Sequence, residues 1–256
     1  MSVFEKGIAV ISIDDGSTDN YRLYQLLKAY GVPATFNIVT SRIGDGEHMT
    51  LDQLREIHED SLMEIACHGH THKNSDEDIL LGNQRLFEWF GEGDGKIGFA
   101  SPGSDMKQDF VAQNQSHLRE MGLVYVRSAT NFKPSERHLA LLESLKKENA
   151  PEKVLRNVSQ LIYGFPDMFV PSVVVHQYTN VEDLEALADL AAAEKACLVF
   201  MFHRVKKQGE ENYENTWSYD FDKTERFLKY LAKKRRDGAL QLCTTREVFE
   251  RYHSDI

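Results

Sequence analysis

The chain has 256 residues, of which 41% are hydrophobic and 27% charged, a balance typical of a folded globular protein. Its 40 acidic residues outnumber the 30 basic ones, so the net charge of −10 argues against nucleic-acid binding. No apolar run approaches the roughly 20 residues that cross a bilayer, and we expect no membrane association. Three scattered cysteines are too few for a disulfide framework. No leader is visible at the start, which predicts a cytoplasmic location or a secreted protein whose leader has been removed.

Short apolar runs alternate with helical patterns along the chain. The first run, Gly7–Ile13, is β-branched and unbroken, as expected of a strand buried on both faces. We expect further strands at 34–39, 63–66, 97–100, 123–127, 172–175, 197–202 and 240–243. We expect helices at about 20–30, after a capping box at 50–53, at 76–90, 108–120 and 136–162, around 184–190, at 222–236 and after 244. This alternation predicts an α/β protein with one barrel of parallel strands in a single domain, residues 1–256.

Two neighbouring carboxylates end the first strand, Asp14 and Asp15, and Gly16 follows them. Adjacent strand side chains point to opposite faces. At the end of a strand, however, a glycine can turn the chain sharply, so both carboxylates can reach the barrel mouth. Capping of the next helix explains the two residues alone equally well.

Three of the ten histidines lie within His68–His72. Neutral imidazole is a common zinc ligand, and two imidazoles with one carboxylate leave a coordination position for water. The spacing leaves open whether His68 and His72 bind, or an H-x-H pair, or whether the loop is simply rich in histidine. His203 follows the strand 197–202, so it is expected at the same rim, where barrel enzymes carry out their chemistry, although a structural role fits it as well.

Several other features are interpreted as structural. They are His176 at a strand end, the turn Gly91–Gly95, the basic helix end Lys233–Arg236 and Cys67 as a buried filler. Trp217 lies in a polar loop, where it stacks on a sugar ring or packs within the loop.

Together these residues resemble the polysaccharide deacetylase family, the NodB homology domain of carbohydrate esterase family 4. Ile11–Gly16 is similar to its T-F-D-D-G motif, and Glu64–His72 to its E-I-G-x-H-[ST]-x-x-H motif. Tyr30–Phe36 matches its G-V-P-A-T-F stretch. Phe99–Gly103 stands where the family has F-R-x-P-[YG], and Leu198–His203 where it has a late strand that ends in histidine. The resemblance runs from about residue 8 to 250 and implies a distorted (β/α) barrel of seven to eight strands.

The resemblance also implies roles, position by position. One divalent metal ion, usually zinc with cobalt or nickel as alternatives, would bind to Asp15, His68 and His72. The metal would activate a water molecule and polarise the amide carbonyl. Asp14 would be the catalytic base and His203 the general acid that protonates the leaving amine, while the backbone N–H of Gly103 would help to hold the oxyanion. His70 falls at a variable position and is not expected to be a ligand.

Two positions depart from the family pattern. Gly69 replaces the hydroxyl residue that follows the first metal ligand, and Ala100 replaces the arginine that pairs with the base. Arg127 and Arg204 are the candidates for supplying the missing guanidinium.

We therefore expect a zinc-dependent deacetylase that removes N-acetyl groups from an amino-sugar oligomer or polysaccharide. Hydrolysis of a small intracellular amide, cyclic imide or ureide is the second hypothesis, favoured by the cytoplasmic location. A catalytically inactive carbohydrate-binding barrel is the third, and Ala100 motivates it. An amidohydrolase that uses His70 and His72 as an H-x-H pair is disfavoured, because such enzymes place that pair on the first strand. No feature of the sequence indicates an oligomeric state.

Overall fold

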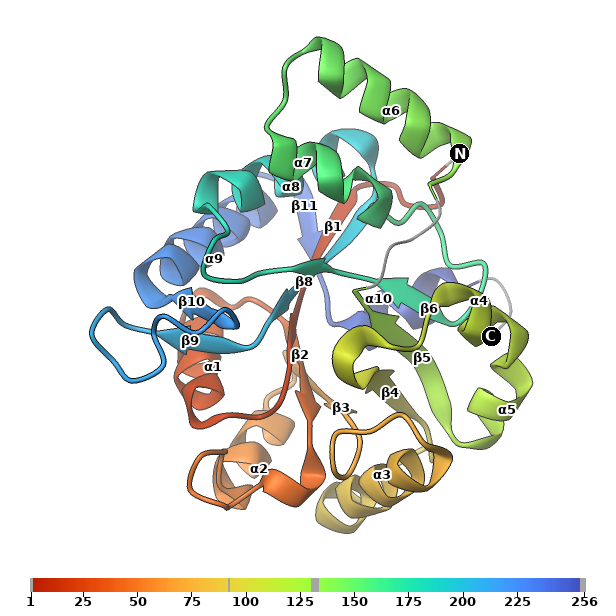
Figure 1. Ribbon diagram of the computed structural model, residues 1–256, viewed down its shortest axis with the longest axis vertical. Helices are drawn as coiled ribbons and strands as arrows, with labels where there is room; N and C mark the ends of the chain where they lie inside the picture. Colours follow the sequence, from red (N-terminus) through yellow and green to blue (C-terminus); the bar gives the residue numbers. More distant parts are fainter. Residues whose placement is uncertain (1, 92, 130–133, 254–256) are drawn as a thin grey trace.

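The computed structural model describes residues 2–91, 93–129 and 134–253. Its strands lie in the middle of the molecule and its helices surround them (Figure 1). The strands of the main sheet are β1 (Gly7–Ile13), β2 (Ala34–Ile38), β3 (Met63–Cys67), β4 (Ile97–Ala100), β5 (Leu123–Ser128), β6 (Phe169–Pro171), β7 (Val173–Val174), β8 (Cys197–Phe202) and β11 (Leu240–Leu242). The long helices are α1 (Thr18–Tyr30), α2 (Leu51–Glu59), α3 (Asp76–Phe90), α6 (Glu136–Lys147), α8 (Val181–Glu194), α9 (Phe221–Arg236) and α10 (Thr245–Tyr252).

The strands form a nearly closed ring whose two end strands, β6 and β7, follow each other directly in the chain. The order is β6-β5-β4-β3-β2-β1-β8-β7, and each pair along it is parallel. Only Ser172 separates β6 from β7, and β6 pairs with β5 while β7 pairs with β8. β11 pairs with the N-terminal half of β1, and β2 pairs with its C-terminal half. The expected distorted barrel of seven to eight parallel strands is confirmed.

Two expected helical regions differ in detail, and one pair of strands is additional. The helix expected over 108–120 is two short helices, α4 (Gln108–Gln113) and α5 (Gln115–Glu120), because Asn114 leaves the helical conformation at φ −111°. The region 136–162 contains α6, α7 (Glu152–Asn157) and a 3-10 turn. A small parallel pair, β9 (Arg204–Lys206) and β10 (Ser218–Asp220), was not expected.

Helix α10 covers the N-terminal end of the barrel. The Thr245 and Thr35 hydroxyls are 2.9 Å apart, and the backbone N–H of Arg246 donates to the carboxylate of Glu64 at 3.0 Å. The Tyr125 hydroxyl donates to the same carboxylate at 2.7 Å. With this end covered, the C-terminal ends of the strands form the open mouth. In the described part of the chain, no helix has the length and apolar character needed to cross a membrane.

Candidate active site

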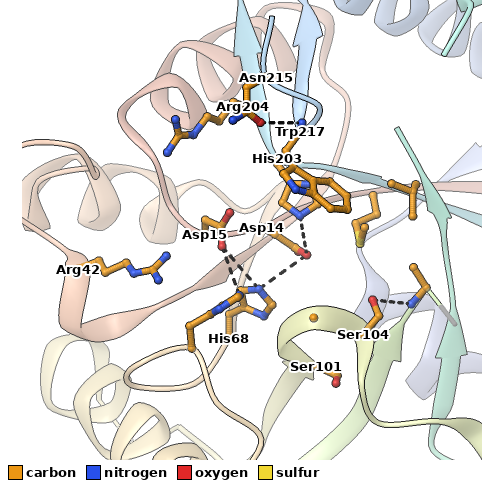
Figure 2. A pocket seen from close by; sticks show the side chains of 15 residues that line it. Asp14, Asp15, Arg42, His68, Ser101, Ser104, His203, Arg204, Asn215 and Trp217 are labelled. Atoms are coloured by element: carbon orange, nitrogen blue, oxygen red, sulfur yellow. Dashed lines mark hydrogen bonds and ion pairs between the residues drawn. The ribbon is translucent and has the colours of Figure 1, made fainter. Parts of the chain in front are cut away.

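A cavity of about 550 Å³ opens at the C-terminal ends of the strands (Figure 2). The side chains around it come from the C-terminal ends of several strands and from the loops after them, including those after β1, β3, β4 and β8, so residues far apart in sequence meet there. All residues to which the sequence analysis assigns a catalytic or metal-binding role line it: Asp14, Asp15, His68, His72, Gly103 and His203.

The end of β1 turns so that both of its carboxylates face this cavity. Asp14 continues the strand pairing, because its backbone N–H donates to the carbonyl of Phe202 at 2.9 Å. Asp15 has a left-handed backbone with φ +78°, and Gly16 has the same φ. A left-handed aspartate is energetically unfavourable and is retained where the surrounding structure fixes it. The turn thus begins one residue earlier than the glycine alone suggested.

Asp15, His68 and His72 gather their ligand atoms within 4.8 Å of one another. The Asp15 Oδ1 atom lies 3.8 Å from Nε2 of His68 and 3.7 Å from Nε2 of His72. These separations are too long for direct hydrogen bonds, which end near 3.2 Å. They suit three ligand atoms that each lie about 2 Å from a shared cation. Nδ1 of buried His68 lies 2.7 Å from the carbonyl oxygen of Ala100, so this nitrogen carries the proton and Nε2 is left free for an ion. Burial lowers the pKa of His68, which favours the neutral imidazole that a metal requires. The three residues fit a divalent metal.

A buried carboxylate holds the loop that carries His72. Asp78 accepts hydrogen bonds from the backbone N–H groups of Thr71 and Lys73, at 2.9 and 3.0 Å. A Cβ atom added to Gly69 would lie 2.6 Å from Asp78 Oδ2, so the missing hydroxyl residue has no space in this loop. Asp78 therefore holds the backbone on both sides of His72, in the loop where Gly69 replaces the hydroxyl residue of the family motif. The sequence analysis missed Asp78, which resembles an ordinary acidic residue in the first turn of α3.

Arg127 supplies a guanidinium to Asp14. Its Nη2 atom forms a buried ion pair with Oδ1 of Asp14, and Asn37 donates to the same oxygen at 2.8 Å. Arg127 is the register partner of Ala100 in the neighbouring strand, so both side chains lie on the same face of the sheet. Burial raises the pKa of Asp14, but the charge and hydrogen bond of Arg127, together with the electrostatic influence of the two neighbouring histidine rings, outweigh it and lower the pKa to about 2. Asp14 is therefore a carboxylate at neutral pH.

His203 lies across the cavity from the metal ligands. Its Nε2 atom is 3.9 Å from Asp14 Oδ2, and its ring packs on Trp217 with ring centroids 4.8 Å apart. Nδ1 is buried and has no hydrogen-bond partner among the described residues. The Asn20 side chain donates to the backbone carbonyl of His203 at 2.6 Å and fixes the strand end. Gly103, at φ +62° within the turn Pro102–Ser104, lines the wall next to these groups.

The other histidines and the cysteine that the sequence analysis weighed lie apart from this cluster. His70 places Nδ1 2.9 Å from the Thr40 hydroxyl, and His176 places Nε2 3.2 Å from Lys153 Nζ. Burial raises the pKa of Cys67 to about 12, so its thiol stays protonated.

A model of the polysaccharide deacetylase family matches residues 2–123. A protein of Bacillus subtilis (strain 168) named "Putative polysaccharide deacetylase YxkH" is 43% identical over 49 residues. That match spans 19% of this chain and 18% of the relative, so the matched part is less than a fifth of the relative's length.

Solved structures with a similar backbone fold include three whose descriptions place them in carbohydrate esterase family 4. The Xyl-CE4 domain of a multidomain xylanase, from the hindgut metagenome of Trinervitermes trinervoides, is 16% identical, with a TM-score of 0.47 over 96% of this chain and 91% of that chain. A family 4 acetyl xylan esterase from Clostridium thermocellum in complex with a cobalt ion is 15% identical, with a TM-score of 0.49 over 95% and 91%. A CE4 family pseudoenzyme from Bacillus anthracis is 14% identical, with a TM-score of 0.48 over 98% and 68%. These likenesses are too distant to bear on the chemistry of the site. The match over residues 2–123 confirms the resemblance to the polysaccharide deacetylase family for the motifs of that stretch, from Ile11–Gly16 to Phe99–Gly103.

Proposed function

We propose that the protein is a metal-dependent hydrolase that removes N-acetyl groups from an amino-sugar glycan. The observation that carries the proposal is the placement of a base, an acid and a metal-ligand triad around one cavity. Asp14 and His203 face each other at 3.9 Å, and the ligand atoms of Asp15, His68 and His72 lie within 4.8 Å of one another.

The triad would hold zinc, or cobalt or nickel. A divalent cation, when bound there, polarises the substrate carbonyl and lowers the pKa of a water molecule. Asp14 accepts a proton from the attacking water as the water oxygen bonds to the carbonyl carbon, and the electron pair of the C=O bond moves to the carbonyl oxygen. The C–N bond then breaks as the carbonyl re-forms. His203 donates a proton to the leaving nitrogen, so the products are acetate and an amine. The backbone N–H of Gly103 is the proposed donor to the developing oxyanion.

Two further features support an active enzyme on a glycan. Arg127 pairs with Asp14 in place of the arginine absent at Ala100, so the feature that favoured an inactive barrel loses its weight. Trp217 is 49% exposed beside His203, as suits a ring that stacks on a sugar, and a cavity of about 550 Å³ is larger than a small amide or ureide needs.

The test is acetate release by zinc-loaded protein from N-acetylglucosamine oligomers and acetylated wall fragments. Asp14→Asn should retain zinc and lose turnover, whereas Asp15→Ala should lose both. Asp52→Asn, a fully exposed aspartate on α2, is the matched control and should behave as wild type. Full activity of Asp14→Asn would refute the role of the base, and zinc retained by Asp15→Ala would refute the ligand set.

A further inference from the structure

Two arginines of the cavity stand out because their guanidinium groups have no partner among the residues that the structure describes. The other half-buried arginines of the described chain each donate to a carboxylate or a carbonyl oxygen: Arg22, Arg137, Arg235 and Arg246. Arg42 and Arg204 are also half-buried and line the cavity. Within the residues that the structure describes, neither side chain makes a hydrogen bond or an ion pair.

The backbone positions of both arginines are fixed by the barrel. Arg42 ends the 3-10 turn Thr40–Arg42 that directly follows the loop after β2. Arg204 begins β9, which pairs with β10 and is tied to α1 by the Lys206–Asp19 ion pair at 2.9 Å. In Figure 2 both guanidinium groups lie on the Asp15 side of the cavity, away from Ser101 and Ser104.

This arrangement is unexpected in a chain with a net charge of −10, where acidic partners are abundant. The two side chains are half-buried, yet none of their guanidinium nitrogens is buried, so both positive charges are held at the cavity and remain open to a ligand. Two unpaired positive charges at one cavity attract an anionic group. The planar guanidinium matches the geometry of a carboxylate or a phosphate. The Asp14 carboxylate is not the partner of these two arginines, because Arg127 already pairs with it.

We propose that Arg42 and Arg204 bind an anionic group, carboxylate or phosphate, on the substrate glycan. The inference rests on the proposed function and makes it more specific, because it predicts an acidic oligosaccharide in place of a neutral one. Trp217, exposed at the same cavity, would support the face of a sugar ring while the arginines hold its charged substituent.

The first experiment measures binding without turnover, by calorimetry on zinc-loaded Asp14→Asn protein. Three oligomers of equal length are compared: neutral N-acetylglucosamine, one alternating with N-acetylmuramic acid, whose lactyl group adds a carboxylate, and one carrying 6-phosphates. We expect an anionic oligomer to bind about tenfold or more tightly than the neutral one, and the better anion identifies the source of charge. Equal affinity for all three would overturn the proposal.

Variants assign the effect to the two arginines. Arg42→Gln and Arg204→Gln should each lower the affinity for the anionic oligomer about tenfold and the affinity for the neutral oligomer by less. Arg119→Gln, an exposed arginine on α5, is the matched control and should alter neither affinity. An anion preference that survives both substitutions would refute the assignment.

Turnover by the Asp14-containing enzyme separates this inference from the proposed function. Anion-dependent binding without acetate release from any oligomer would refute the proposed deacetylase activity but support the anion site. Acetate release with the same kcat/KM on neutral and anionic oligomers would sink the anion site alone. The expected preference in kcat/KM should shrink as ionic strength rises, because salt screens the partly exposed charges.

Discussion

Replacing Arg127 by methionine tests whether a guanidinium on β5 performs the task that Ala100 leaves open. Methionine approximates the length of the arginine stem and keeps packing against Met201, whose Sδ atom lies 2.7 Å from Arg127 Nη1. It removes the donor to Asp14 and leaves that carboxylate with Asn37 as its remaining donor to Oδ1. We expect Arg127→Met to lower both the free energy of unfolding and the rate of acetate release.

The size of the effect follows from burial. The Arg127 and Asp14 side chains are 1% and 4% exposed, so water cannot replace the lost partner. Removing one member of such a buried pair costs about 3–5 kcal/mol, and because Asn37 remains we expect the lower end, about 3 kcal/mol. A base displaced by about 1 Å loses on the order of 100-fold in kcat. Zinc affinity should not fall, because Arg127 donates to none of the three proposed ligands and its positive charge, which acts on His68, disfavours a cation there.

The assay pairs acetate release with urea unfolding and zinc titration. Arg127→Lys keeps the charge and should recover part of the loss, while Arg119→Met, the exposed control, should resemble wild type. The decisive variant is the exchange Ala100→Arg with Arg127→Ala, which moves the guanidinium to the paired position on β4. Recovery of kcat by the exchange supports a positioning role. Near-normal kcat in folded Arg127→Met, or a loss explained entirely by the unfolded fraction, would refute the reasoning.

Three further predictions concern the ligands, their loop and acid stability. Asp15→Asn should lower zinc affinity at least about tenfold in a competition titration, with the metal-free protein still folded. Asp78→Asn weakens the acceptor of two loop N–H groups and should lower zinc affinity by a smaller factor in the same titration; unchanged affinity would contradict its role. His138 accepts a hydrogen bond at Nδ1 from the backbone N–H of Ser135 and donates one from Nε2 to the carbonyl of Leu161, and burial lowers its pKa. As the pH falls below 6.5, this histidine therefore binds a proton in the unfolded chain before it does so in the folded protein, and the free energy of unfolding declines. Urea unfolding at about pH 7 and pH 5.5 should show this loss, and His138→Gln should reduce it.

Local patterns predicted most of the fold because each strand is a short apolar run with a clear end. The capping box expected at Thr50 is present at the start of α2, and the helix expected after 244 also begins with a capping box, at Thr244. The closing strand could not be predicted in its actual form. Pro171 has no N–H to donate, and the ladder changes partner from β5 to β8 directly after it, an arrangement that depends on the curvature of the whole ring.

Within the site, sequence reasoning was sufficient for residues that share one strand end or one loop. Asp14 and Asp15 are neighbours, and His68 and His72 lie on one loop, so their motifs are visible in the printed sequence. Asn37 was missed, although a polar residue within the apolar run of β2 signals a side chain that faces the inside of the barrel. Its donation to Asp14 depends on the register between β1 and β2, which spacing along the chain does not give.

The arginine at the base illustrates the same limit with a larger consequence. The sequence analysis judged Ala100 by its own position in a motif. Position 100 on β4 is paired with position 127 on β5, and side chains at both positions reach the same volume inside the barrel. What the chemistry requires of this volume is a positive charge near Asp14, irrespective of the strand that supplies it. Arg127 meets this requirement, and Arg204, the other candidate, lines the cavity without contacting the base. The loss of a motif residue therefore argues for inactivity only after the register partners have been inspected.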